Sequence, residues 1–381
     1  MRHLCLVILI LFSMTTNSQS LLYSIEVGDL KVGFSKNAEL LGFAYFLGYE
    51  SIGIETDTMD IKGSRVPKKD WHAYGYALSQ KYGHFRESEQ LQIAFALADH
   101  LWLDTLLNLL LQLEEIPNAR IPEDMDPSNY IAFSKSRNPE EALKNVTQFL
   151  EGINAFSVEV GFDTYLMESL PYYQRSMQEI SENLPTADFI PAMEHYFDMG
   201  FQSYTLIPSL TIPKGMGFGL NLGKGGVVNI FGALDAQQIS PKDSLAMGFS
   251  NAQELRELSV HEFGHSFVNP IVARMPEEKF TGTESLFEPI RDVIYRQGYN
   301  TWKACMYEHF VRGMELYFSE QYDTPEAYQA MFHEYIKSRQ FIYIPLILKE
   351  LKAAAREGRP FETAVRKSMD RLIEKASSSQ R

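Results

Sequence analysis

The chain has 381 residues, of which 45% are hydrophobic and 22% are charged, and its formal net charge is −14. This composition is typical of a globular protein with a sizeable core, and the length allows two or three domains. No run of Lys and Arg is long enough to form the basic patch of a nucleic-acid binding protein, so we expect no nucleic-acid partner.

The chain begins with MRHLCLVILILFSMTTNSQS, which has the three parts of a secretory signal peptide. Arg2 supplies a short basic region, residues 4–14 form an apolar stretch, and small polar residues follow. We expect a signal peptide in residues 1–18, with cleavage after Ser18 or Ser20, and therefore a secreted or periplasmic protein. The apolar stretch is shorter than the roughly 20 residues that cross a bilayer, and we expect no transmembrane segment after its removal.

Residues 21–190 are expected to form a largely helical N-terminal region. Residues 23–34 alternate in a way that indicates a short strand or hairpin. Proline recurs in residues 115–129, which predicts a loop. Apolar residues recur at helical spacing in four segments, residues 37–50, 83–115, 138–156 and 163–184. The segment 83–115 predicts two helices.

Residues 201–235 are rich in β-branched and aromatic residues and are punctuated by Gly and Pro, which predicts two to four strands. Residues 295–377 are again largely helical in pattern. Helices, a small sheet and further helices follow one another without βαβ alternation. The predicted fold class is therefore α+β, mostly helical, with a small antiparallel or mixed sheet. The last residues, 351–381, are expected to form a C-terminal helix and tail.

The segment VHEFGHSFVNP, residues 260–270, contains the pattern H-E-x-x-H. Residues four apart lie on the same face of a helix, so His261 and His265 can bind one zinc ion at about 2.0–2.1 Å. Glu262 is rotated beside them and can take a proton from a metal-bound water as a general base. The alternative is a pair of core histidines that are satisfied by hydrogen bonds.

The residues around this motif favour a helix. Ser250 is a suitable N-cap, and Gln253 three residues later completes a capping box. Pro270 is expected to end the helix. Gly264 costs about 1 kcal/mol relative to Ala in a helix, and a close approach by another element would account for it.

Residues 250–320 resemble the zincin superfamily of zinc metallopeptidases. The wider chain, over residues 37–350, resembles a family of secreted bacterial proteins that is catalogued as a domain of unknown function. This wider resemblance rests on HEFGHSFVNP, on the helix-rich N-terminal half and on the downstream segment YEHFVR. It implies a zincin-like catalytic domain over residues 191–350, in which a small sheet precedes the H-E-x-x-H helix.

The types of zincin differ in their third zinc ligand. Metzincins place Gly and His where this chain has Val268 and Ile271, which excludes them. A gluzincin takes its third ligand from a glutamate on a later helix, as in the His₂Glu sites. We therefore expect a gluzincin-like protein with a carboxylate that faces inward.

Glu308 is the best candidate for this ligand. It shares a helix face with small and apolar residues, an unfavourable place for an unpaired charge, and Arg312 four residues later can orient it. The alternative is a partly exposed ion pair between Glu308 and Arg312. Glu315 is the reserve ligand, and the remaining candidates are Glu284, Glu288 and Asp292.

Peptide hydrolysis also needs a group that stabilises the developing oxyanion. The possible transition-state or supporting residues are Arg312, Tyr307, His309, Tyr299, Tyr295 and His195.

The sequence thus predicts a secreted zinc metallopeptidase that acts on a peptide or protein substrate lying along an edge strand of the sheet. Two alternatives stay open. One is a binding protein without turnover on a zincin scaffold. The other is a zinc amidase that acts on cell-wall or modified peptides. The oligomeric state cannot be read from the sequence.

Overall fold

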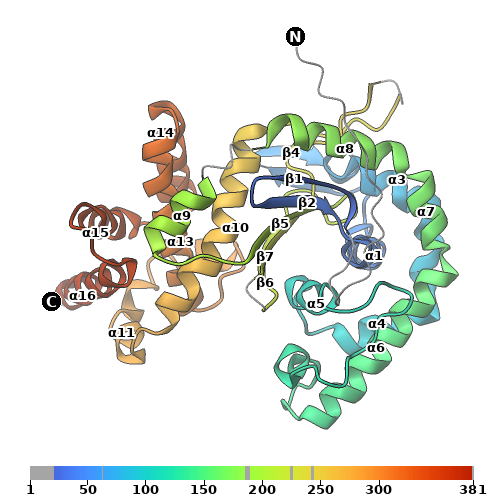
Figure 1. Cartoon of the computed structure of the whole chain (residues 1–381), viewed down its shortest axis with the longest axis horizontal. Helices are drawn as coiled ribbons and strands as arrows, with labels where there is room; N and C mark the ends of the chain where they lie inside the picture. Colours follow the sequence, from blue (N-terminus) through green and yellow to red (C-terminus); the bar gives the residue numbers. More distant parts are fainter. Residues whose placement is uncertain (1–20, 62, 185–188, 224–225, 242–243, 380–381) are drawn as a thin grey trace.

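The computed structural model describes residues 21–379, apart from residues 62, 185–188, 224–225 and 242–243. The predicted signal peptide, residues 1–18, lies outside the described residues. The described chain is mostly helical with a small mixed sheet, which confirms the α+β class. In Figure 1 the sheet and the long helix α10 lie between the N-terminal helices and the C-terminal helices α13–α16.

The N-terminal helices occupy most of the chain between the second and third strands of the main sheet. They are α1 (Lys36–Tyr45), α2 (Lys68–Trp71), α3 (Ala73–Tyr82), α4 (Glu89–Ala98), α5 (Leu103–Leu110), α6 (Pro139–Glu159), α7 (Phe162–Glu168), α8 (Leu170–Asn183) and α9 (Phe189–Phe197). The two helices expected in residues 83–115 are α4 and α5, and the segment rich in proline is a loop with short 3₁₀ turns.

Local sequence signals explain where these helices start. In α6, the Asn138 side chain accepts a hydrogen bond from the Glu141 backbone N–H, and Pro139 occupies the first turn. In α1, Ser35 caps the Ala38 N–H in the same way. Both starts follow the preference for a capping side chain, because the first N–H groups of a helix have no partner inside it.

The main sheet contains five strands in the order β1-β2-β5-β7-β6. The pairs β1–β2 and β7–β6 are antiparallel, whereas β2–β5 and β5–β7 are parallel. The strands are β1 (Leu22–Val27), β2 (Leu30–Phe34), β5 (Ser203–Pro208), β6 (Gly217–Asn221) and β7 (Gly226–Phe231), and β3 (Thr58–Ile61) and β4 (Ser64–Pro67) form a separate hairpin.

The predicted strands of residues 201–235 are therefore present as β5, β6 and β7, but they are only part of the sheet. The N-terminal hairpin β1–β2 adds two more strands through the parallel pairing of β2 with β5. Pairing between segments so far apart in the chain leaves no local pattern, since each strand shows only its own alternation. Strand β6 lies at the end of this order and is an edge strand.

The C-terminal half begins with the helix that carries the H-E-x-x-H motif. The helices are α10 (Ala252–Ala273), α11 (Glu277–Thr281), α12 (Arg291–Tyr295), α13 (Trp302–Tyr322), α14 (Pro325–His333), α15 (Ile344–Arg356) and α16 (Phe361–Ser379). On one side α10 packs against β6 and β7, and on the other it packs against α13. This position places the motif between the sheet edge and the C-terminal helices.

Two details of α10 differ from the sequence prediction. The N-cap is Asn251 rather than Ser250, and its side chain accepts a hydrogen bond from the Glu254 backbone N–H. The capping pair is thus shifted by one residue. Pro270 does not end the helix, which continues to Ala273. Pro270 is exposed and less than one turn from the end, so the bend that a proline causes affects only the last residues of the helix.

Among the described residues, no single helix is both long and apolar enough to span a membrane, and one bent pair, α4 with α5, satisfies that criterion by length and composition.

Candidate metal centre

Helices α10 and α13 approach each other closely at Gly264. A Cβ added there would lie 2.3 Å from Cε, the flexible end of the Met314 side chain, and 3.6 Å from Cγ1 of Val311, both on α13. The close approach that the sequence predicted to explain Gly264 therefore comes from α13. It brings the inner face of α13 to the two histidines of α10.

Three side chains converge between these helices. His261, His265 and Glu308 each offer one ligand atom, and the three atoms lie within 4.8 Å of one another. The two Nε2 atoms are 3.2 Å apart. Glu308 Oε1 lies 3.2 Å from His265 Nε2, and Glu308 Oε2 lies 3.7 Å from His261 Nε2. The sequence prediction grouped these same three residues.

These distances fit a metal ion. Two ligands bound at about 2.0–2.1 Å with a tetrahedral angle lie roughly 3.3 Å apart. Glu308 Oε2 is also buried and accepts no hydrogen bond of good geometry, although Nη2 of Arg312 lies 3.2 Å away. Buried acceptors normally have a partner. The donor set of two imidazoles and one carboxylate is therefore arranged for a cation.

The other ring nitrogen of each histidine has a partner that orients the ring. His261 Nδ1 lies 2.9 Å from Glu315 Oε2, and His265 Nδ1 lies 3.4 Å from Asn269 Oδ1. With the proton on Nδ1 in both rings, both Nε2 lone pairs point to the same space. Two such lone pairs 3.2 Å apart repel each other unless a proton or a metal ion lies between them.

Glu315, the reserve ligand of the sequence prediction, lies outside this group of three and contacts the far nitrogen of His261 instead. Its second oxygen accepts a hydrogen bond from the Tyr335 hydroxyl at 3.0 Å. A carboxylate that binds the far nitrogen of a metal-binding histidine fixes the tautomer and raises the basicity of the ring. The other reserve ligands, Glu284, Glu288 and Asp292, have exposed side chains outside the cluster.

Arg312 supplies the buried positive charge of the cluster. Its guanidinium pairs with Glu308 and lies between the rings of Tyr335 and Phe341. The predicted ion pair with Glu308 exists, but both partners are buried, in contrast to the partly exposed pair of the alternative interpretation. Arg312 thus neutralises one of the carboxylates and fixes its orientation.

The electrostatics of the cluster favour a bound cation. Burial alone would raise the pKa of Glu308, but Arg312 and the two imidazoles lower it well below its usual range. Burial alone would lower the pKa of His265, but the carboxylate of Glu308 raises it to about 9. Charged carboxylates in a buried site attract a positive ion, whether a proton or a metal.

Glu262 lies on the side of α10 that faces the edge strand β6. A Cβ on Gly219 would lie 2.2 Å from the Glu262 carbonyl oxygen and 3.0 Å from its Oε2, so only glycine allows this approach. The Glu262 side chain is 7% exposed. Its carboxylate accepts no hydrogen bond from the described residues, in contrast to Glu315, and it is therefore available for chemistry.

The other predicted supporting residues are distributed unevenly. His309 is fully buried, its Nδ1 lies 2.8 Å from the Cys305 carbonyl oxygen, and burial lowers its pKa to about 4, so it is a core residue. Tyr295 and His195 are exposed, and neither belongs to the cluster. Tyr299 is half-buried against Phe341 and interacts with Arg312.

Tyr307 is the predicted supporting residue that borders open space beside the cluster. With His265, it lines a pocket of about 330 Å³ between α10 and the edge strand β6. The sequence missed two residues that complete the surroundings of the histidines. Asn269, four residues after His265, could have been found from helical spacing, whereas Tyr335 lies too far along the chain from Glu315 to give a local signal.

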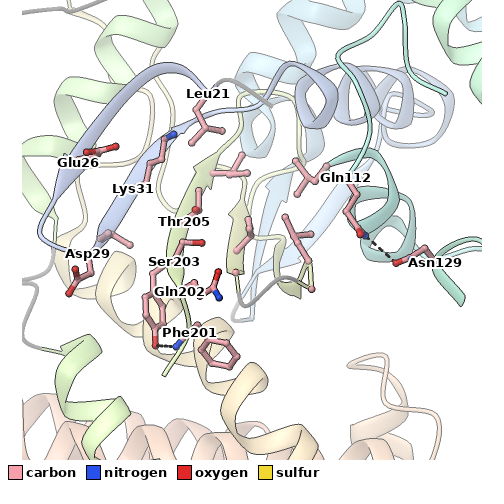
Figure 2. A pocket seen from close by; sticks show the side chains of 18 of the residues that line it. Leu21, Glu26, Asp29, Lys31, Gln112, Asn129, Phe201, Gln202, Ser203 and Thr205 are labelled. Atoms are coloured by element: carbon pink, nitrogen blue, oxygen red, sulfur yellow. Dashed lines mark hydrogen bonds between the residues drawn. The ribbon is translucent and has the colours of Figure 1, made fainter. Parts of the chain in front are cut away.

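A larger hollow of about 820 Å³ lies elsewhere (Figure 2). Lys31, Thr205 and Val228 line it from three neighbouring strands in register. Tyr204 also lines the hollow and packs on Phe263 of α10. The lining contains no residue of the metal cluster.

The model of one protein family, described as "Domain of unknown function (DUF4932)", matches residues 30–363. Since the match covers most of the chain, the chain belongs to this family. No curated protein and no solved structure matches it.

Proposed function

We propose that this member of the DUF4932 family is a secreted zinc metallopeptidase with a His₂Glu site of the gluzincin type. His261, His265 and Glu308 would bind zinc, and Glu262 would act as the general base. The convergence of the three ligand atoms within 4.8 Å, beside a buried glutamate, carries the proposal.

The choice of zinc rests on the ligand set. Imidazole nitrogen and a single carboxylate oxygen suit zinc, and three protein ligands leave the open position that a catalytic site requires. When bound, zinc would lower the pKa of a coordinated water and polarise a substrate carbonyl. Glu315 and Asn269 would keep both imidazoles in the tautomer that presents Nε2.

Glu262 would hold the proton that is removed from the attacking water. Its place next to His261 on α10 and its contact with Gly219 keep the carboxylate at the edge of the cluster. General-base catalysis contributes roughly 10²–10⁴-fold to a rate. Arg312 is bound to Glu308 and buried, so its role is to position that ligand rather than to contact substrate.

The edge strand β6 supports a peptide as substrate. It pairs with β7 on one side only and passes beside Glu262. An extended peptide can add to such an edge through backbone hydrogen bonds, which would bring its carbonyl groups alongside the cluster. An amidase that acts on modified peptides would use the same groups. A binding protein without turnover would not need an uncommitted carboxylate at Glu262.

The test is elemental analysis of the purified protein, followed by cleavage of a peptide library. We expect about one zinc per chain in the wild type and none in His265→Ala. Glu262→Gln should keep the metal and lose cleavage. The matched control is Glu257→Gln, a change of the same type on the same helix outside the cluster, which should retain both metal and activity.

Two results would contradict the proposal in different ways. Wild-type protein that binds no zinc after reconstitution would remove the metal site. Stoichiometric zinc with equal cleavage by wild type and Glu262→Gln would remove the catalytic assignment of Glu262.

A further inference from the structure

Beyond His265, α10 continues for two turns toward its end at Ala273 and forms one wall of an open pocket of about 330 Å³. The edge strand β6 forms the opposite wall, and α13 contributes one side chain. The lining residues are Gly219, Asn221, His265, Ser266, Asn269, Pro270, Ala273 and Tyr307. His265 belongs both to this lining and to the metal cluster, so the pocket begins where the cluster ends.

The lining is uncharged apart from the imidazole of His265. Small side chains and a tyrosine ring form the rest of it, in a chain whose formal net charge is −14. As a metal ligand the His265 imidazole is neutral, so a charged group placed there would lose water and find no opposite charge among the lining side chains, which is unfavourable. An uncharged side chain carries no such cost.

Two features of α10 make a carboxylate the least suitable occupant. The pocket lies along the last turns of the helix, where the backbone dipole places partial negative charge. Pro270 has no N–H, so it donates no hydrogen bond to the Ser266 carbonyl four positions earlier. The lining amides and hydroxyls can donate as well as accept hydrogen bonds, so it is the partial negative charge of the helix end that disfavours a carboxylate.

The position of the pocket relates it to a bound peptide. Gly219 and Asn221 are alternate residues of β6, and both line it. In a peptide that pairs with β6, alternate side chains point to the same face. One of them would then enter the pocket next to the metal.

We propose that this pocket is a specificity subsite that accepts an uncharged side chain of the substrate residue beside the scissile bond and rejects acidic side chains most strongly. The inference rests on the proposed peptidase function, because it assigns the pocket to the same cleft. Ala273 determines the charge of the far wall, since it is exposed and lines the pocket.

The experiment uses the zinc-loaded full chain and measures binding, so that it does not depend on turnover. Two series of peptide hydroxamates carry Leu, Gln, Lys or Glu on one side or the other of the zinc-binding group, and calorimetry gives their Kd. The variant is Ala273→Glu. The matched control is Ala252→Glu, which adds the same charge at an exposed position in the first turn of α10.

In one of the two series, wild type should bind the Leu and Gln compounds at least about tenfold more tightly than the Glu compound. Ala273→Glu should improve binding of the Lys compound by about five- to tenfold relative to Leu, while Ala252→Glu should leave the order unchanged. Equal affinities across the side chains in both series, or equal behaviour of the two variants, would overturn the inference while leaving the zinc site intact. A protein that binds no zinc would instead overturn the proposed function, and the subsite with it.

Discussion

Two polar clusters in this molecule each contain a buried glutamate but differ in how their atoms are paired. The first surrounds Glu39 of α1, whose side chain is fully buried. Its Oε2 accepts a hydrogen bond from the Tyr173 hydroxyl at 2.8 Å, and its Oε1 accepts one from the Leu210 backbone N–H at 3.0 Å. The Thr211 hydroxyl donates to its backbone carbonyl at 2.7 Å.

This first cluster is complete in itself. The nearby hydroxyls of Tyr74 and Tyr165 are 3.0 Å apart and bond to each other. Each oxygen of the Glu39 carboxyl group already has a partner, so no place is left for a ligand. The cluster ties α1 to the segment after β5, which leads to the edge strand β6. We assign it a structural role.

The second cluster, between α10 and α13, is open. The Nε2 atoms of two imidazoles and a carboxylate converge on one point, and their outer atoms are bound by Glu315, Asn269 and Arg312. A buried polar cluster is therefore structural where donors meet acceptors, and it is a candidate binding site where acceptors converge. The predictions below test this distinction.

The largest expected effect is a change of stability with zinc in the second cluster. A ligand that binds only the folded state at a concentration of about 1,000 Kd adds about 4 kcal/mol to the free energy of unfolding. We expect a chelator to lower the melting temperature of the wild type by several degrees in calorimetry. The chelator should have no effect on His265→Ala. Glu39→Gln should respond as the wild type does, because the first cluster holds no metal.

The first cluster should instead respond to pH. Burial raises the pKa of Glu39 from 4.5 to about 7 despite its hydrogen bonds. Because the pKa is raised in the folded state, the contribution of Glu39 to the free energy of unfolding is fully present below about pH 4.5 and is lost as the pH rises through about 7. The free energy of unfolding falls by about 1.4 kcal/mol per pH unit between these two pKa values, so the total loss, complete above pH 7, is on the order of 3 kcal/mol.

Glu39→Gln tests this prediction, because glutamine keeps the shape and stays neutral. Denaturant unfolding between pH 4.5 and 8 should show that the variant gains stability relative to the wild type as the pH rises. Glu123→Gln, which removes an exposed carboxylate from a loop, should show no such trend. A constant difference between Glu39→Gln and wild type across this range would mean that Glu39 does not change its charge.

The two clusters also differ in how much of them the sequence revealed. H-E-x-x-H requires only a helix to place two histidines on one face, and the lone acidic residues on the apolar face of 300–318 pointed to Glu308. Glu308 and Glu315 lie on the same face, so periodicity could not decide which of them faces the metal. That choice depends on the distance between α10 and α13, which Gly264 and Met314 set.

The Glu39 cluster gave no signal at all. Glu39 of α1 lies more than a hundred residues along the chain from its partners in α8 and in the segment after β5. The pairing of β2 with β5 escaped for the same reason. Helices and their caps follow from neighbouring residues, but contacts between distant segments depend on the packed fold. The predictions of an N-cap at Ser250 and of a helix end at Pro270 were wrong by one turn or less, since the N-cap is Asn251 and the helix ends at Ala273.

The smallest expected effects separate the residues behind the metal ligands from the ligands themselves. Glu315→Gln keeps an acceptor for His261 Nδ1 but removes the charge, and changes of this kind cost about 10–100-fold in metal affinity. Tyr335→Phe removes only the hydroxyl that donates to Glu315, at 3.0 Å. One hydrogen bond to a charged group contributes about 1.5–3 kcal/mol at most, and part of this loss falls on stability rather than on zinc. We therefore expect Tyr335→Phe to weaken zinc binding by less than Glu315→Gln does, in competition titrations with a chelating dye.

Tyr173→Phe is the matched change in the first cluster, since it also removes a hydroxyl bound to a buried glutamate. It should destabilise the protein and leave zinc affinity unchanged. If Glu315→Gln bound zinc as tightly as the wild type, the carboxylate would not support His261, and the contrast between the two clusters would rest on the ligands alone.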